Sequence, residues 1–402
     1  MAFLRAQAKA GSLDADFSYL AADSLYFDSA CQTLRPQQVI DAMDEYYHEY
    51  NACGERVKYE WGRKVDQKVA AARESLLRLA GKSGRDYVCA FTLNTTYGLN
   101  LILSQLPPGI YKNMVTSETE HNSVFLPTIT WAKKLGLKRI VLARQNDGFL
   151  NYAKTDLAKS VVVVNTTSNV NGANLANASE LVHDTHGSGG IVIFDGAQTM
   201  GHNAEILKGV DYDAICFSGH KMYGPSLGII IIKKKLLNML SFDFIGGGMV
   251  QDVQLGSYTL LSDEPHTRLE AGLQNFAGII GLGTAVDWQK NYRPESQSAK
   301  EYESMLGQKL FDGLSQIPSL KILNQSPASI ISFYSTKIDA HQLAIYLSAQ
   351  DIMARSGYFC CHYYLSAKLN LPPQLRLSLG LNNTEDQVAK LIETLQKIIG
   401  SR

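Results

Sequence analysis

Two apolar runs in the middle of the chain each end in residues that could do chemistry. The run at 191–194 is followed by the motif DGAQ, which begins at Asp195, and the run at 214–217 is followed by SGHKMYGP, which contains Lys221. Ligand sites in an open α/β sheet lie beyond the carboxyl ends of the strands, so we expect this carboxylate and this amine to meet at one edge. Pyridoxal phosphate needs both groups, because its aldehyde forms a Schiff base with a lysine and a carboxylate keeps its ring nitrogen protonated. The sequence therefore predicts pyridoxal 5′-phosphate as cofactor, with Lys221 and Asp195 as the residues that hold it.

Short polar residues near the ends of expected strands could bind the phosphate of such a cofactor. Thr95 and Thr96 lie between an expected strand and an expected helix. A helix N-terminus that carries two hydroxyl groups is suited to binding phosphate. Ser218 and His220, which come just before the lysine, are suited to donate hydrogen bonds to the same group.

Strands and helices must alternate along the chain to position these residues. Several candidate strands are continuously apolar, which is typical of strands covered by helices on both faces. The expected strands lie at 87–92, 113–116, 139–143, 160–165, 190–194, 214–218 and 229–233. A helical pattern from Val69 to Leu79 precedes the first of them and stops near Gly81. The sequence thus predicts an α/β fold with a mostly parallel central sheet flanked by helices.

The region after Trp288 has a different pattern and predicts a smaller α+β domain. A long helix is expected over 295–314, followed by short strands at 330–334 and 374–379. The chain closes with a capping box that begins at Thr384 and with an apolar helix face that ends at Gly400. We therefore expect a large cofactor-binding domain over residues 20–290 and a small domain formed by residues 1–19 and 291–402.

The composition excludes several classes of protein. The 402 residues include 38 Lys and Arg against 38 Asp and Glu, so no net positive charge is available to bind nucleic acid. The longest apolar stretch, 276–286, is interrupted by glycines and is too short to span a bilayer, and residues 1–16 lack the apolar core of a secretory signal. Six cysteines without a C-x-x-C pair predict neither a disulfide framework nor a metal site. We expect a cytoplasmic protein that binds no nucleic acid and no membrane.

Motifs along most of the chain resemble the class V aminotransferase superfamily of fold-type I pyridoxal-phosphate enzymes. The resemblance is greatest to the group II branch of cysteine desulfurases and selenocysteine lyases. In chain order the motifs are YFDSA (26–30), NTTYGLN (94–100), EHNS (120–123), SNVNG (168–172), DGAQ (195–198), FSGHKMYGP (217–225), GGGM (246–249), LEAG (269–272), RSGYFC (355–360) and RLS (376–378).

The resemblance implies roles for five further residues. His121 would stack on the pyridine ring and assist proton transfer. Asn169 and Gln198 would donate hydrogen bonds to the phenolic oxygen of the cofactor or to the substrate carboxylate. Arg376 would bind that carboxylate with both arms of its guanidinium group, and Ala30 would line the substrate end of the pocket.

The resemblance also implies an activity. L-Cysteine would be converted to L-alanine, with Lys221 moving the proton at Cα and Cys360 accepting the sulfur as a persulfide. The register of the R-S-G-x-x-C motif selects Cys360 over its neighbour Cys361. Alternatives remain open at this point: a cysteine or selenocysteine lyase, or an epimerase or hydrolase of the same fold that uses no catalytic thiol.

The chain departs from the family pattern at four places. Leu273 and Gln274 stand where the family has Thr-Pro, so a phosphate contact from the partner subunit is lost or is replaced by Gln274 or Asn275. Tyr-Phe precedes the candidate thiol in place of His-His, and a second cysteine follows it directly. Cys31 stands where the family has alanine.

The resemblance implies partners as well. A homodimer with active sites at its interface is expected, and Arg56 is a candidate for reaching across that interface. A dedicated protein that accepts sulfur is a further expected partner. The amino-acid sequence identifies neither this protein nor the pathway.

Overall fold

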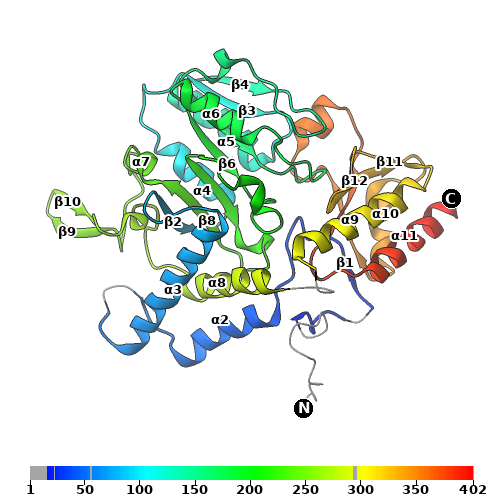
Figure 1. Ribbon diagram of the computed structural model, residues 1–402, viewed down its shortest axis with the longest axis horizontal. Helices are drawn as coiled ribbons and strands as arrows, with labels where there is room; N and C mark the ends of the chain where they lie inside the picture. Colours follow the sequence, from blue (N-terminus) through cyan, green and yellow to red (C-terminus); the bar gives the residue numbers. More distant parts are fainter. Residues whose placement is uncertain (1–15, 22, 55–56, 293–296, 402) are drawn as a thin grey trace.

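The structure is a computed structural model that describes residues 16–21, 23–54, 57–292 and 297–401. Its largest element is a seven-stranded sheet (Figure 1). In spatial order the strands are β2 (Tyr87–Thr92), β8 (Gly228–Lys233), β7 (Ala214–Ser218), β6 (Ile191–Asp195), β5 (Ser160–Asn165), β3 (Asn113–Ser117) and β4 (Lys138–Leu142). β8 runs antiparallel to β2 and β7 and all other neighbouring strands are parallel, so the predicted mostly parallel sheet is confirmed. The seven predicted strands are all present, with ends shifted by one residue at most.

Helices cover both faces of this sheet because its strands are apolar on both sides. Val162 and Val164 of β5 pack into the cluster that contains residues of α3 (Glu60–Leu79), α6 (Ala178–Gly187) and α8 (Phe276–Asn291). Val161 and Val163 of the same strand pack on the opposite face with α4 (Thr95–Ser104) and α5 (Asn122–Leu135). The alternation follows from the two-residue period of a strand. The helix predicted from Val69 to Leu79 is the second half of α3.

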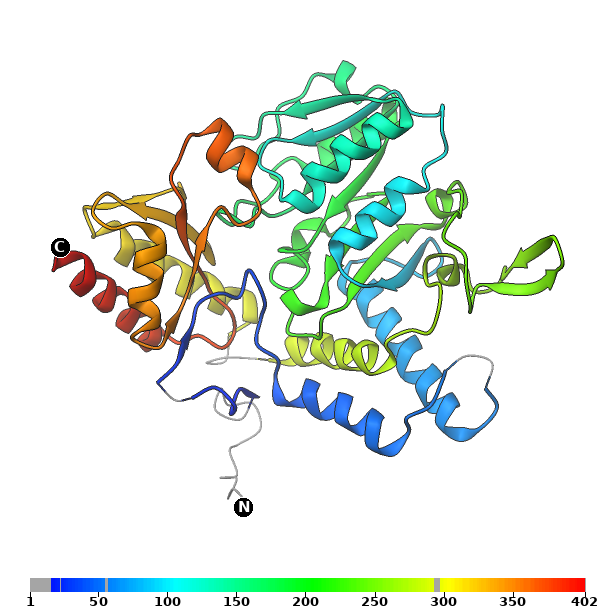
Figure 2. The same cartoon turned by 180° about the vertical axis from the view of Figure 1, so that it is seen from behind.

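A second, smaller sheet lies beside the first and carries the C-terminal part of the chain (Figures 1 and 2). Its antiparallel strands, in spatial order, are β11 (Leu320–Ile322), β12 (Ile330–Ser335), β15 (Gln374–Ser378) and β14 (Arg355–Gly357). It packs with α9 (Ala299–Ser315), α10 (Ala340–Ser348) and α11 (Glu385–Gly400). Phe17, Leu25 and Phe27 join the same apolar cluster. The division into domains at about residue 290 stays a prediction, and residues 1–15 of the expected small domain lie outside the described residues.

The prediction for one helix of this part was wrong at its start. The helix expected from residue 295 begins at Ala299, because Ser298 caps it. The Ser298 hydroxyl accepts a hydrogen bond from Glu301 N (3.2 Å), and Glu301 Oε2 accepts one from Ser298 N (3.0 Å). Residues 295–296 lie outside the described residues. The capping box at Thr384 is confirmed, although α11 includes Gly400 and is capped by Ser401.

Shorter elements complete the fold. They are β1 (Leu25–Tyr26), β13 (Ile352–Met353), α2 (Gln37–Glu49), α7 (Lys234–Leu237), η1 (Lys154–Leu157), η2 (Ala204–Leu207), η3 (Gly219–Lys221), η4 (Pro265–Leu269) and the π-helical turn η6 (Tyr363–Lys368). The hairpin of β9 (Val250–Gln254) and β10 (Ser257–Leu260) projects from the body of the molecule in both views (Figures 1 and 2). Across the described part of the chain, every helix is too short or too polar to cross a membrane.

Candidate active site

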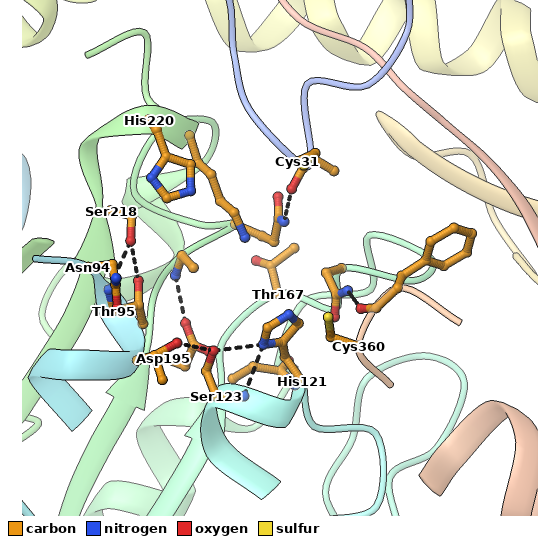
Figure 3. A pocket seen from close by; sticks show the side chains of 18 of the residues that line it. Cys31, Asn94, Thr95, His121, Ser123, Thr167, Asp195, Ser218, His220 and Cys360 are labelled. Carbon is orange, nitrogen blue, oxygen red and sulfur yellow. Dashed lines mark hydrogen bonds between the residues drawn. The ribbon is translucent and has the colours of Figure 1, made fainter. Parts of the chain in front are cut away.

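The twelve residues predicted to form the site surround one cavity of about 280 Å³ at the carboxyl ends of the parallel strands (Figure 3). They are Ala30, Thr95, Thr96, His121, Asn169, Asp195, Gln198, Ser218, His220, Lys221, Cys360 and Arg376. The N-terminal loop, the larger sheet and the smaller sheet each contribute part of the wall, so Ala30 from one end of the chain meets Arg376 from the other. Among the described residues, no group of three or more His, Cys, Asp or Glu side chains is arranged to hold a metal ion.

Asp195 ends β6, and Lys221 lies in the short turn η3 that directly follows β7, the adjacent parallel strand. Asp195 is the last residue of its strand, is buried, and accepts a hydrogen bond from Ala197 N at 2.9 Å. Burial raises the pKa of Asp195, and the nearby Lys221 opposes that shift. Removal from bulk water lowers the pKa of Lys221, and Asp195 is the largest opposing influence. A positively charged ring nitrogen beside Asp195 would therefore keep its carboxylate ionised.

Hydroxyl groups gather at the N-terminus of α4. Asn94 caps the helix by accepting a hydrogen bond from Tyr97 N at 2.9 Å. Thr95 N donates to Ser218 Oγ at 2.9 Å, and the hydroxyls of Thr95 and Ser218 lie 2.6 Å apart (Figure 3). The hydroxyl of Thr96 contacts that of Ser123 at 2.6 Å. Helix dipole, backbone amides and hydroxyls together make this corner of the cavity suited to a phosphate group.

His121 is placed as the N-cap of α5, so its ring is fixed at the cavity wall. Its Nδ1 accepts a hydrogen bond from Ser123 N at 3.0 Å and lies 2.8 Å from Ser123 Oγ. Burial lowers the pKa of His121 to about 3, and Lys221, Arg376 and Arg355 contribute to the same shift. His121 is therefore neutral near pH 7. Because Nδ1 accepts the backbone hydrogen bond, the proton of the neutral ring is assigned to Nε2.

Arg376, on β15, is buried under the cavity and held by two partners. Its Nη1 donates to Asn169 O and its Nη2 to Asp28 Oδ1, each at 3.0 Å. Its guanidinium lies 4.8 Å from the ring centre of Phe359. The Nε atom is buried and has no hydrogen-bond partner among the described residues. The arginine is thus fixed in place and retains donors for a carboxylate ligand.

The amide side chains of Gln198 and Asn169 connect different segments of the cavity wall. Gln198 Nε2 donates to Ala30 O at 2.7 Å, while its Oε1 is buried without a partner among the described residues. Asn169 Nδ2 donates to Phe359 O at 2.8 Å, and Asn169 Oδ1 accepts from the Cys361 thiol at 3.1 Å. Both ends of the Asn169 amide therefore hold the loop that carries the candidate thiol. Contact of Asn169 with a cofactor or substrate stays a prediction.

The two neighbouring thiols occupy different environments. Cys360 lines the cavity, whereas Cys361 is buried, packs with Phe359 and Leu365, and donates its proton to Asn169. Burial raises the pKa of Cys361 well above its ordinary value, so its thiol stays protonated. Phe359 and Cys360 both have positive φ angles, 49° and 57°, which are unusual for side-chain-bearing residues. In this loop the side chain of Cys360 therefore faces the cavity, and the side chain of Cys361 faces the core.

Several residues in the cavity wall or in contact with it were not assigned a role from the sequence. Ser123 links His121 to Thr96, and Asp28 neutralises Arg376. Both residues belong to motifs on which the family resemblance is based, and this was the signal in the sequence that could have identified them. Asn165 is the last residue of the apolar strand β5 and Thr167 follows it closely, so their position at a strand end was a signal of the same kind as that of Asp195.

The departures at Leu273 and Gln274 lie away from the cavity. Gln274 Nε2 donates to the carbonyls of Glu270 and Gly272, and Asn275 caps α8 by accepting from Gly278 N. Both candidate replacements for the missing phosphate contact are therefore engaged locally. Leu273 is 78% exposed. Arg56, the other residue expected to reach a partner, lies outside the described residues.

The donor set of the cavity fits pyridoxal 5′-phosphate. A carboxylate, an amine, a helix N-terminus with hydroxyls and a neutral imidazole border one space. Two of the lining residues, Gln198 and Arg376, also have buried atoms that lack hydrogen-bond partners among the described residues. Such atoms are costly unless a ligand or water satisfies them.

Comparisons with known proteins agree with one another. The family model for aminotransferase class-V matches residues 25–391. A cysteine desulfurase of Serratia proteamaculans is 32% identical over 384 residues, which cover 93% of each chain. A probable cysteine desulfurase of Pyrococcus abyssi is 30% identical and covers 95% of this chain and 96% of its own.

Solved structures extend the similarity to three dimensions. The S-sulfonic acid form of a cysteine desulfurase from Escherichia coli matches with a TM-score of 0.85 at 26% identity, over 96% of this chain and 97% of its own. The apo cysteine desulfurase of Thermococcus onnurineus matches with a TM-score of 0.84 at 28% identity, over 94% of this chain and 95% of its own.

Proposed function

The chain belongs to the aminotransferase class-V family, and we propose that it is a cysteine desulfurase that converts L-cysteine to L-alanine and takes up the sulfur on Cys360. One observation carries the proposal: Asp195, Lys221 and Arg376 border the same cavity as an accessible thiol, Cys360. A lyase, epimerase or hydrolase of this fold would need the first three residues but not the thiol. The relatives from Serratia and Pyrococcus, named cysteine desulfurases, support the same choice.

Pyridoxal 5′-phosphate is the cofactor, and when bound it supplies the electron sink that makes the Cα–H bond of an amino acid acidic. Lys221 would hold it covalently, and Asp195 would hold its ring nitrogen. The α4 N-terminus, with Thr95 and Ser218, would hold its phosphate.

The residues of the chain divide the work on the substrate. Arg376 binds the α-carboxylate, and its fixed guanidinium orients Cα toward Lys221. The amine of Lys221 removes the Cα proton; its lowered pKa makes the unprotonated form available closer to neutral pH. Neutral His121 can donate a hydrogen bond through Nε2 without placing a charge beside the reacting atoms.

The thiol then takes the sulfur. Cys360 Sγ forms a bond to the sulfur of the substrate as the Cβ–S bond of the substrate breaks, and the carbon skeleton is protonated to alanine. The products are alanine and a persulfide on Cys360, so atoms and electrons balance without an external oxidant. A sulfur-acceptor protein would discharge the persulfide. We place the enzyme in the cytoplasm, where reduced thiols persist.

The function is tested on holoenzyme with a panel of amino acids. L-Cysteine, L-selenocysteine, L-cystine and L-alanine are offered separately, in the presence of a reductant for the persulfide. We expect alanine and sulfide in equal amounts from L-cysteine. Pyruvate and ammonia as the main products would identify a lyase and overturn the proposal.

Asp195→Asn is expected to lower turnover of L-cysteine by about 10²-fold, the size of effect seen when one preorganised charged partner is removed. The substitution keeps the shape of the side chain but removes its negative charge, so the ring nitrogen loses its counter-ion. Steady-state kinetics and the pH dependence of the visible absorption of the cofactor measure the effect. Thr199→Ser, which removes one methyl group near Asp195 and keeps the hydroxyl that contacts Thr166, serves as control. Unchanged kcat and spectrum in Asp195→Asn would remove Asp195 from the site.

We propose that the enzyme is a homodimer. Apolar side chains are exposed on the projecting hairpin and on the nearby loop: Val253 is 62% exposed, Leu255 fully exposed and Leu273 78% exposed. Leu93, which is 69% exposed, directly precedes the Asn94 cap of α4 at the phosphate end of the cavity. Exposed apolar side chains grouped in this way are typical of a protein interface.

Leu255→Asp together with Leu273→Asp is therefore expected to shift the enzyme from dimer to monomer in sedimentation velocity and to lower its affinity for the cofactor. Ile345→Asp is a matched control, because Ile345 is 66% exposed on α10, on the small C-terminal part far from the hairpin. A wild-type protein that sediments as an active monomer would contradict the proposal.

A further inference from the structure

Cys31, a thiol without a role in the proposed reaction, borders the same cavity as Cys360. It belongs to a turn in which Cys31 N donates to Asp28 O at 2.9 Å. Ala30 N anchors the same turn by donating to Ser378 Oγ of β15, also at 2.9 Å. The turn is therefore fixed on the strand that carries Arg376. Cys31 is partly exposed and its neighbour Gln32 is exposed, so this thiol stands at the edge of the cavity toward solvent.

Arg355 joins this thiol to the segment that bears Cys360. Its Nη1 donates a hydrogen bond to Cys31 Sγ, so the sulfur is the acceptor in this contact. Arg355 begins β14 and pairs directly with Arg376 on β15. The chain continues from β14 into the loop with Cys360.

Both sulfur atoms converge on the same reaction centre. Cys31 and Cys360 line one cavity, and each lies close enough to Lys221 to influence the pKa of its ammonium group. Arg376, 3% exposed, lines the same cavity and has a buried Nε without a partner among the described residues. That atom is a donor suited to a polar ligand in the cavity that Cys31 also borders.

We propose that Cys31 is a second sulfur acceptor, which takes the terminal sulfur from the persulfide of Cys360. The inference rests on the proposed function, because that function loads Cys360. In the transfer, Cys31 Sγ forms a bond to the terminal sulfur while the S–S bond of Cys360 breaks. The electron pair of that bond returns to Cys360 as a thiolate, and Cys31 carries the persulfide. No external oxidant or reductant is needed.

The arrangement of the three thiols in this part of the chain favours a transfer from Cys360 to Cys31. The backbone of the Cys360 loop is held inward, since Asn122 N donates to Cys360 O at 2.7 Å and Asn169 Nδ2 donates to Phe359 O. Cys361 is buried and protonated, and its thiol donates a hydrogen bond to Asn169, so it is a poor acceptor of sulfur. Transfer to Cys31 places the sulfur on a partly exposed thiol next to the exposed Gln32, where an external thiol can collect it.

The test follows persulfide on individual cysteines. Holoenzyme is mixed with an amount of L-cysteine below one equivalent, alkylated with iodoacetamide at increasing times, and analysed by peptide mass spectrometry. In the wild type we expect persulfide first on Cys360 and later on Cys31. Cys360→Ser should reduce label on Cys31 by about tenfold or more, and Cys31→Ala should keep label on Cys360. Cys53→Ala, which removes another exposed thiol, should behave as the wild type.

Three results would overturn the relay. They are a persulfide confined to Cys360 in the wild type, equal labelling of Cys31 and Cys53, and a Cys31–Cys360 disulfide formed with release of sulfide. The enzyme is also loaded with glutathione persulfide in place of cysteine. This arm distinguishes failure of the relay from failure of the proposed function. If L-cysteine yields no alanine, the desulfurase assignment is wrong. The enzyme loaded with glutathione persulfide still shows whether sulfur passes from Cys360 to Cys31. Equal Cys31 label with and without Cys360 after such loading would again overturn the relay.

Discussion

Lys221→Ala is expected to abolish the covalent attachment of pyridoxal phosphate and to lower turnover of L-cysteine by about 10⁴-fold, the upper range for loss of a general base. The lysine has two tasks, anchoring the cofactor and moving the Cα proton, and alanine can do neither. Borohydride reduction followed by peptide mapping measures the attachment directly. The wild type should carry the pyridoxyl group on Lys221 and the variant on no residue.

Lys208→Ala is a suitable control, because Lys208 is exposed in the segment between β6 and β7 and lies outside the cavity. It should keep both the attachment and the turnover. Attachment of the reduced cofactor to another lysine in Lys221→Ala would contradict the assignment. So would a variant that turns over L-cysteine at the rate of the wild type.

Cys360→Ser is expected to lower alanine formation on the order of 10³-fold or more while the cofactor stays bound. Serine cannot accept sulfur from the substrate, yet its size and polarity leave the loop and the cavity wall intact. Alanine release and the visible absorption of the cofactor, measured on the same sample, separate the two effects.

Cys361→Ser provides the matched control at the neighbouring position. Its hydroxyl can replace the hydrogen bond that the thiol donates to Asn169, so the loop should keep its conformation and the enzyme most of its activity. An inactive Cys361→Ser with an active Cys360→Ser would shift the nucleophile by one residue. Full activity in both single variants and in the double variant would contradict a thiol mechanism altogether.

Much of the fold was predictable because its strands are continuously apolar. Runs such as 161–164 and 229–232 must be covered on both faces, and this requirement leads to a sheet between two layers of helices. The meeting of Asp195 and Lys221 was predictable for the same reason. Both follow apolar strands, and the carboxyl ends of parallel strands meet at one edge.

The contacts between the N-terminal loop, the large sheet and the small sheet were not predictable in this way. Asp28 binds Arg376 and Cys31 binds Arg355 across more than three hundred residues, and no periodicity in the sequence reports such pairs. The family resemblance brought Arg376 and Cys360 to attention but assigned no role to Asp28 or Arg355. The different environments of Cys360 and Cys361 follow from two residues with positive φ, which the sequence Tyr-Phe-Cys-Cys does not predict.

The central claim is that one cavity thiol accepts the sulfur of L-cysteine, and a single-turnover experiment tests it most directly. Holoenzyme without reductant is mixed with excess L-cysteine and quenched within the first turnover. Free alanine and the total persulfide on the Cys360 and Cys31 peptides are then counted in the same sample. The account predicts that the two appear together, in equal amounts and at the same rate, and that Cys360→Ser yields neither. Alanine that forms without persulfide on either peptide, or pyruvate that forms in its place, would contradict the account.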